Sequence, residues 1–102
     1  MLDDQNVDVT YSESDTKARF GASVRGFASA AELTVSKVTP DLVIADHTYV
    51  PDELRGRGLA QTLILHLIAD TRAKGQRIVP LCPFVRAYAQ QHQEEVGDVF
   101  QW

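Results

Sequence analysis

The first half of the chain alternates apolar and polar positions, which is the pattern of half-buried β-strands. Val7, Val9 and Tyr11 alternate with polar residues and predict a short strand at the edge of a sheet. The period of two continues through residues 18–24 and, after an Arg-Gly turn signal, through residues 27–36. Because the connections between these segments are short, they favour an antiparallel meander.

A longer and more apolar strand is predicted at residues 42–50, and the period changes after it. Residues 58–74 place apolar side chains at helical spacing, so they predict an amphipathic helix with one apolar stripe. Gly75 stands where a helix often ends with a glycine. The stripe is interpreted as core packing and consists of Leu59, Ala60, Leu63, Ile64, Leu67, Ile68 and Thr71.

Residues 78–82 predict another strand, which should run parallel to the strand before the helix because a helical crossover joins them. Pro80 has no N–H to donate, so this strand cannot pair fully with its neighbour, and the two can separate to leave a slot. Pro83 suits the first turn of a second helix that extends to about His92. The tail, residues 94–102, is expected to dock on the body of the protein or to form a homo-oligomer contact.

The length of 102 residues and an ordinary composition, 44% hydrophobic and 24% charged, predict a single soluble domain over residues 1–102. The net charge of −4 argues against a general nucleic-acid binder, which needs a basic face. Cys82 is the only cysteine, which excludes an internal disulfide and favours a reducing compartment. The polar start and the absence of a membrane-length apolar run make the cytoplasm the expected location, with no membrane partner.

A glycine-containing loop joins the strand predicted at residues 42–50 to the helix that follows. The start of a helix offers unpaired N–H groups and the positive end of the helix dipole. Gly56 and Gly58 let the backbone approach a phosphate closely, and the neighbouring arginines add positive charge. A P-loop would need a lysine that this loop lacks, and a dinucleotide fingerprint would need a small residue where Gln61 stands. The loop therefore predicts a site for a phosphate-bearing ligand, the alternative being a basic surface turn.

Arg55, Gly58 and Ala60 match the spacing Arg/Gln-x-x-Gly-x-Gly/Ala, the pyrophosphate loop of the GCN5-related N-acetyltransferases, which hold acetyl-coenzyme A. Over most of its length the chain resembles the small single-domain members of this superfamily, which have a His-Thr-Glu-Val strand and a Pro-Leu-Cys segment. Tyr49 stands where that family usually has Glu, so a carboxylate is missing there. The further matching segments, in the family's order, are residues 46–51, 54–58 and 79–85, then Tyr88 and His92.

The resemblance implies a compact α/β (α+β) fold, with a mostly antiparallel sheet, two diverging parallel strands around a central helix and a second helix near the C-terminus. It also implies that acetyl-coenzyme A is a substrate, with its pantetheine in the slot between the diverging strands and its pyrophosphate on the glycine loop. Arg57 would neutralise phosphates of coenzyme A, or it is simply a solvated arginine. The cofactor-binding residues implied in this way are Thr48, Tyr49, Val50, Arg55, Gly56, Arg57, Gly58, Leu59, Ala60, Phe84 and Tyr88.

Aminolysis of a thioester needs an unprotonated amine, a stabilised oxyanion and a proton for the leaving thiolate. Tyr88 is a candidate to protonate the thiolate or to line the pocket. His47 is a candidate base, because histidine ordinarily titrates near neutral pH, and its alternative role is that of a packed strand residue. Cys82 is a candidate nucleophile that takes up the acetyl group before the amine does. The alternative for Cys82 is a buried and inert thiol, with direct transfer to the amine.

Metal chemistry is not expected, because the three histidines and the one cysteine lack close ligand spacing. Two classes of function remain open. The first is an acetyl-coenzyme A-dependent N-acetyltransferase, and the second is a non-catalytic module that binds coenzyme A or acyl-coenzyme A and acts through protein partners. The sequence does not specify the acceptor amine, which ranges from small amines and polyamines to protein lysines.

Overall fold

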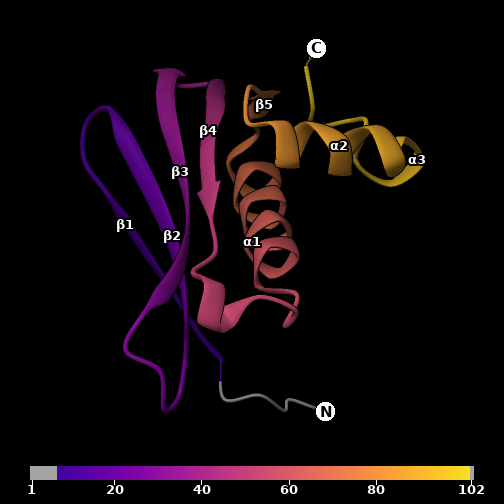
Figure 1. Cartoon of the computed structure of the whole chain (residues 1–102). Helices are drawn as coiled ribbons and strands as arrows, with labels where there is room; N and C mark the ends of the chain where they lie inside the picture. The colour runs from indigo at the N-terminus through magenta and orange to yellow at the C-terminus, as the bar shows by residue number, and fades with distance from the viewer. Residues whose placement is uncertain (1–6, 102) are drawn as a thin grey trace.

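One sheet contains five strands in the order β1-β2-β3-β4-β5, and Figure 1 shows β1 to β4 side by side. The computed structural model describes residues 7–101. β1 to β4 pair antiparallel as a meander, and β5 pairs parallel with β4, as the sequence predicts. The strands are β1 (Val7–Glu13), β2 (Lys17–Val24), β3 (Ala30–Thr39), β4 (Leu42–Tyr49) and β5 (Arg77–Pro80).

The turn between β2 and β3 is longer than the sequence pattern predicts. Gly26 adopts a left-handed φ of 91°, and the Phe27 N–H donates to the Val24 carbonyl at 3.1 Å. Phe27 therefore belongs to the turn and not to the next strand, which begins at Ala30. The Phe27 side chain is partly buried and packs against the core.

One face of the sheet is covered by α1 (Leu59–Lys74), which follows a short 3-10 turn, η1 (Asp52–Leu54) (Figure 1). The helix begins after Gly58 and ends before Gly75, two left-handed residues with φ of 73° and 70°. Its apolar stripe packs mainly on β2 and β3, and each large side chain buried there contributes roughly 1.5–3 kcal/mol. The large buried side chains of this layer include Phe20, Leu33, Val35, Leu59, Leu63, Ile64, Leu67 and Ile68.

β4 and β5 pair over only part of the length of β4. The ladder starts at Leu42 and Arg77 and ends where Ala45 faces Pro80. Beyond that point the Cys82 N–H donates to the Ala45 carbonyl at 2.9 Å, and the chain turns into the next helix. The rest of β4, residues 46–49, pairs with β3 but not with β5. The separation that the proline predicts is therefore present.

The second helix and the tail complete the fold. α2 (Pro83–Gln91) has Cys82 as its N-cap residue, and the short α3 (Gln93–Val96) follows it. The tail then docks on the body of the protein, which is the first of the two arrangements that the sequence predicts for it. The Ile78 N–H donates to the Val99 carbonyl at 2.7 Å, and the Gln101 N–H donates to the Ile78 carbonyl at 2.8 Å. Val96, Val99 and Phe100 are buried, and Trp102 lies outside the described residues.

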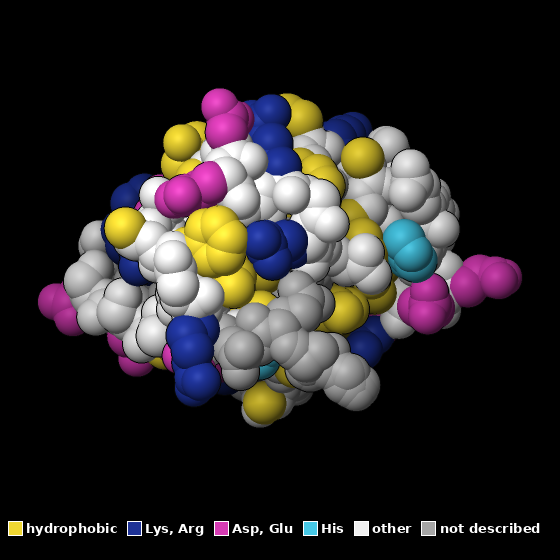
Figure 2. Space-filling view, turned by 60° about the horizontal axis from the view of Figure 1, so that its bottom comes forward, with side chains coloured by type: hydrophobic (Ala, Val, Ile, Leu, Met, Phe, Trp, Pro, Cys, Tyr) yellow, Lys and Arg dark blue, Asp and Glu magenta, His cyan; other side chains and the backbone are white. Residues whose placement is uncertain are grey.

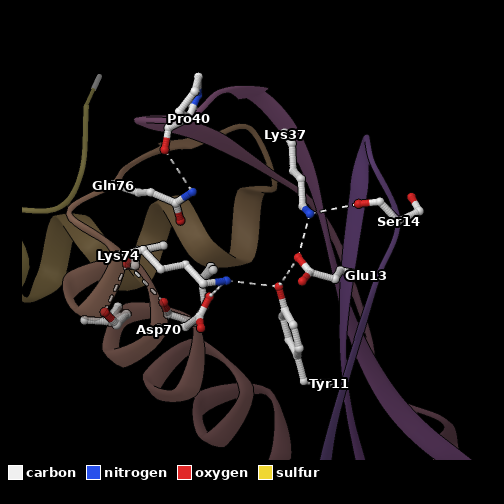
Figure 3. A network of polar contacts seen from close by, with 11 residues as sticks. Tyr11, Glu13, Ser14, Lys37, Pro40, Asp70, Lys74 and Gln76 are labelled. Carbon is white, nitrogen blue, oxygen red and sulfur yellow. Dashed lines mark hydrogen bonds and ion pairs between the residues drawn. The ribbon is translucent and has the colours of Figure 1, made fainter.

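A polar network fixes the β1–β2 hairpin to the C-terminal end of α1 (Figure 3). Tyr11 donates its hydroxyl proton to Glu13 at 3.0 Å and accepts a hydrogen bond from Lys74 at 3.1 Å. Lys37 donates to the same Glu13 oxygen at 2.6 Å, and this hydrogen bond is the main cause of the lowered pKa of Glu13. A carboxylate oxygen of Asp70 lies 3.0 Å from the Nζ of Lys74 and forms an ion pair with it. The network therefore ties the edge of the sheet to the helix at the end remote from the glycine loop.

Candidate functional site

The glycine loop before α1 has the backbone geometry of an anion-binding turn. Gly56 and Gly58 both have positive φ, 82° and 73°, a backbone conformation that residues other than glycine adopt only with strain. The first helical hydrogen bond runs from the Thr62 N–H to the Gly58 carbonyl at 3.0 Å. The N–H groups at residues 59–61 precede that bond and have no carbonyl partner within the helix. Donors and the positive end of the helix dipole therefore meet at this loop.

A pocket of about 260 Å³ lies over this loop. It is bounded by the chain just after β4, by η1, by the first turn of α1 and by one aromatic ring of α2. Leu54 and Gln61 also belong to the lining, although the loop motif does not include them as binding residues; their only signal in the sequence is their position next to the motif. The lining residues are Val50, Leu54, Arg55, Gly56, Gly58, Leu59, Ala60, Gln61 and Phe84.

The two arginines of the loop point to different surroundings. Arg55 lines the pocket, and its Nε lies 3.3 Å from a carboxylate oxygen of Asp52. Arg57 is not part of the lining; its guanidinium carbon lies over the Phe27 ring, 4.5 Å from the ring centroid. Figure 2 views this end of the molecule, where Lys and Arg side chains lie among exposed hydrophobic side chains.

Cys82 and Thr48 meet where β4 and β5 have separated. The Cys82 thiol is buried and donates to the Thr48 hydroxyl oxygen over a distance of 3.4 Å. Phe84, the second residue of α2, lines the pocket, and Cys82 is the N-cap residue of the same helix. The structure thus brings the predicted residues Thr48, Cys82 and Phe84 into one region.

Tyr88 lies on the same face of α2 as Phe84, one turn further on, because residues four apart are neighbours on a helix. Its ring stacks on that of His92 with centroids 4.0 Å apart. The His92 Nδ1 lies 2.8 Å from the Tyr88 carbonyl oxygen, which fixes Nδ1 as the protonated nitrogen of that pair. Tyr88 is partly buried against the core and does not line the pocket itself.

His47 and Tyr49 lie on the other face of the sheet. A β-bulge at Asp46 shifts the register, so His47 pairs with Thr34 on the polar face. The His47 Nε2 lies 4.0 Å from a carboxylate oxygen of Glu32, and its ring stacks on Tyr49 with centroids 6.4 Å apart. His47 is therefore not brought together with the thiol and the pocket.

Other kinds of site find no support in the part of the chain that the structure describes. Within residues 7–101, no three His, Cys, Asp or Glu side chains gather closely enough to hold a metal ion. No helix in the same range is long and apolar enough to cross a membrane.

Comparisons with known proteins agree with this geometry. A protein-family model described as GCN5-related N-acetyl-transferase matches residues 19–99, which include the glycine loop, the end of β4 and Cys82. The NMR solution structure of a GCN5-like protein from Staphylococcus aureus, a proposed N-acetyltransferase, is similar with a TM-score of 0.67. The two chains are 25% identical, and the match covers 94% of this chain and 89% of the other. No curated protein matches the chain significantly.

Proposed function

Because this chain belongs to the GCN5-related N-acetyltransferase family, we propose that it transfers the acetyl group of acetyl-coenzyme A to an amine. The family supports acyltransferase activity in general, and acetyl-coenzyme A as the donor and an amine as the acceptor are the finer parts of the proposal. Its setting would be the cytoplasm, as the single unpaired cysteine favours.

The observation that carries the proposal is the pocket over the glycine loop, beside the unpaired edge of β4. Pyrophosphate would accept hydrogen bonds from the N–H groups of the loop and of the first turn of α1. Arg55 would add charge from the pocket wall. Pantetheine would lie along residues 48–50, where β4 has no strand partner on the β5 side. This arrangement would direct the thioester toward the region of Cys82 and Thr48.

The transfer itself would proceed by direct attack of the amine on the thioester carbonyl. A carbon–nitrogen bond forms, the carbon–sulfur bond breaks, and the coenzyme A thiolate takes a proton while the amine loses one. Tyr88 is the candidate donor of that proton, because it lies on the α2 face that Phe84 extends into the pocket. His47 would serve as base only for an amine that approaches from the polar face of the sheet.

A second candidate function has one specific observation in its favour. The pocket lining contains Arg55 but no Asp, Glu, His, Cys or Tyr side chain among the described residues, so the pocket wall lacks an acid or base. A non-catalytic module that binds coenzyme A and acts through protein partners would need only the loop and the pocket.

Turnover measurements separate the two functions. The protein is incubated with acetyl-coenzyme A and, in separate reactions, with a polyamine, small primary amines and a lysine-containing peptide. We expect acceptor-dependent release of the coenzyme A thiol and an acetylated amine by mass spectrometry. Tight binding of coenzyme A without product on any acceptor would favour the binding module. Absence of both binding and turnover would overturn the proposal.

A further inference from the structure

The side chain of Arg57 occupies a defined position outside the pocket. It lies between Gly56 and Gly58, whose left-handed backbone turns the loop so that both glycines line the pocket and the arginine does not. The guanidinium lies over the Phe27 ring at 4.5 Å. Within residues 7–101 no carboxylate pairs with Arg57, whereas Arg55 pairs with Asp52. The aromatic ring is thus the contact that holds this cation.

Phe27 is well suited to hold a side chain in place. It lies in the turn between β2 and β3, where its N–H donates to the Val24 carbonyl, and its ring is partly buried against the core. A ring fixed in this way orders the guanidinium over one of its faces. Arg57 is itself exposed, so the side of the guanidinium away from Phe27 faces solvent.

We propose that Phe27 and Arg57 form a stacking site for a purine base, which in the proposed function is the adenine of coenzyme A. A guanidinium is planar and weakly hydrated, so it stacks on aromatic faces and on nucleobases in a way that a lysine ammonium does not. The base would lie on the solvent side of the guanidinium, giving the order Phe27, Arg57, adenine. Phe27 is a positioning residue, because it acts through Arg57.

The different positions of the loop residues favour the base over a phosphate as the ligand of Arg57. In the proposed function the pyrophosphate would find its donors on the pocket side, where Arg55, Gly56 and Gly58 form part of the lining. The nucleoside extends beyond the pyrophosphate, away from the pantetheine end of the molecule. Arg57 is therefore the loop residue that remains for the part of coenzyme A outside the pocket.

Three related ligands test this inference, which rests on the proposed function, and keep its failure separate from that of the function. Coenzyme A and dephospho-coenzyme A both carry adenine, and only the first carries the 3′-phosphate. 4′-Phosphopantetheine carries neither and ends at a single phosphate, so the charge-retaining Arg57→Lys variant separates stacking on adenine from a contact with the second phosphate. Affinities are measured by calorimetry for the parent, Arg57→Ala, Arg57→Lys and Phe27→Leu, with circular dichroism to verify that each variant is folded.

We expect Arg57→Ala to weaken coenzyme A and dephospho-coenzyme A about tenfold each, the scale of one stacked base, and to leave 4′-phosphopantetheine unchanged. Arg57→Lys keeps the charge but loses the planar face, so it should behave like Arg57→Ala. Phe27→Leu keeps an apolar side chain in the turn and should weaken the same two ligands by several-fold.

Several results would overturn the inference. A loss confined to coenzyme A would make Arg57 a ligand of the 3′-phosphate, and an equal loss for all three ligands would make it a ligand of the pantetheine-bound phosphate, which all three share. Full affinity in Arg57→Lys would show that charge alone matters. A parent that binds 4′-phosphopantetheine as tightly as coenzyme A would leave no stacking to explain, although the proposed function would stand. A parent that binds none of the three would overturn both.

Discussion

Gly58 and Gly75 offer a matched pair at the two ends of α1. Their φ angles are 73° and 70°, and a Cβ built on either residue meets no atom within 4 Å. An alanine at either position therefore costs similar backbone strain, roughly 1 kcal/mol, without a steric clash. Only Gly58 lines the pocket, where the free space above it is the space that a pyrophosphate would occupy.

We predict that Gly58→Ala weakens coenzyme A binding tenfold or more, whereas Gly75→Ala leaves the affinity unchanged, as measured by calorimetry. Both variants should lose similar thermal stability, because both introduce the same strained conformation. Equal affinities in the two variants would show that the loop does not hold the ligand.

Cys82 is the residue whose chemistry separates one-step from two-step transfer. Its side chain is 5% exposed and its thiol donates to Thr48, which favours a packing role. We predict that incubation with acetyl-coenzyme A, without an acceptor, adds no acetyl group to the intact protein. Cys82→Ala should retain turnover within about threefold, since direct transfer does not use the thiol.

Two-step transfer through Cys82 would give a different result in the same experiments. In a two-step route the acetyl carbon would leave the coenzyme A sulfur and bond to the Cys82 sulfur, and the coenzyme A thiol would be released with the Cys82 proton. One acetyl group on the parent protein, absent from Cys82→Ala, would contradict direct transfer. Loss of turnover in a folded Cys82→Ala protein would point the same way.

At the level of elements, the sequence pattern predicts the ends of helices and strands where these depend on neighbouring residues. The change of period at Gly58 and the glycine at position 75 mark the ends of α1 correctly, because helix termini depend on nearby residues. Pro80 likewise marks the place where β5 leaves β4. By strict alternation His47 would lie on the same face as Val43 and Ala45, but the bulge at Asp46 moves it to the polar face. A bulge depends on the partner strand and leaves no clear local signal.

The docked tail is held by an ion pair that should respond to pH. Arg72 donates to Asp98 at 2.8 Å, and this hydrogen bond lowers the pKa of Asp98 and raises that of Arg72. A carboxyl whose pKa is lower in the folded state contributes stability above its unfolded pKa and loses it as pH falls through its folded pKa. The contribution of Asp98 should therefore be present at neutral pH and disappear in acid.

We predict that Asp98→Asn lowers the melting temperature at pH 7 and that the difference from the parent closes as the pH falls below about 4. Glu94→Gln is the control, because Glu94 is an exposed carboxylate of α3. It should match the parent across the range. A difference for Asp98→Asn that stays constant with pH would show that the ion pair does not stabilise the tail.

At the scale of the whole molecule, the meander, the crossover helix and the position of the glycine loop follow from periodicity and turn residues. The contacts between side chains around the site cannot be predicted in this way, because they join segments that are far apart in the sequence. Phe27 and Arg57 come from two separate loops, and their contact exists only once β2, β3 and α1 are packed. The bridge between Ile78 and Phe100 is likewise a product of the assembled fold.

Ligand binding offers a measurement on the whole molecule. The buried residues of β2, β3, α1 and the docked tail form one continuous cluster, so we predict a single cooperative thermal transition, as expected for one domain.

A ligand that binds only the folded state at about 100 times its Kd adds roughly 2.7 kcal/mol of stability, which for a domain of this size raises the Tm by about 10 °C or more. Coenzyme A should produce this shift in the parent and in Gly75→Ala but a much smaller one in Gly58→Ala. Inorganic pyrophosphate at the same concentration should give little shift, because it lacks the pantetheine and nucleoside contacts. An equal Tm shift with coenzyme A in the parent, Gly75→Ala and Gly58→Ala would place the ligand away from the glycine loop.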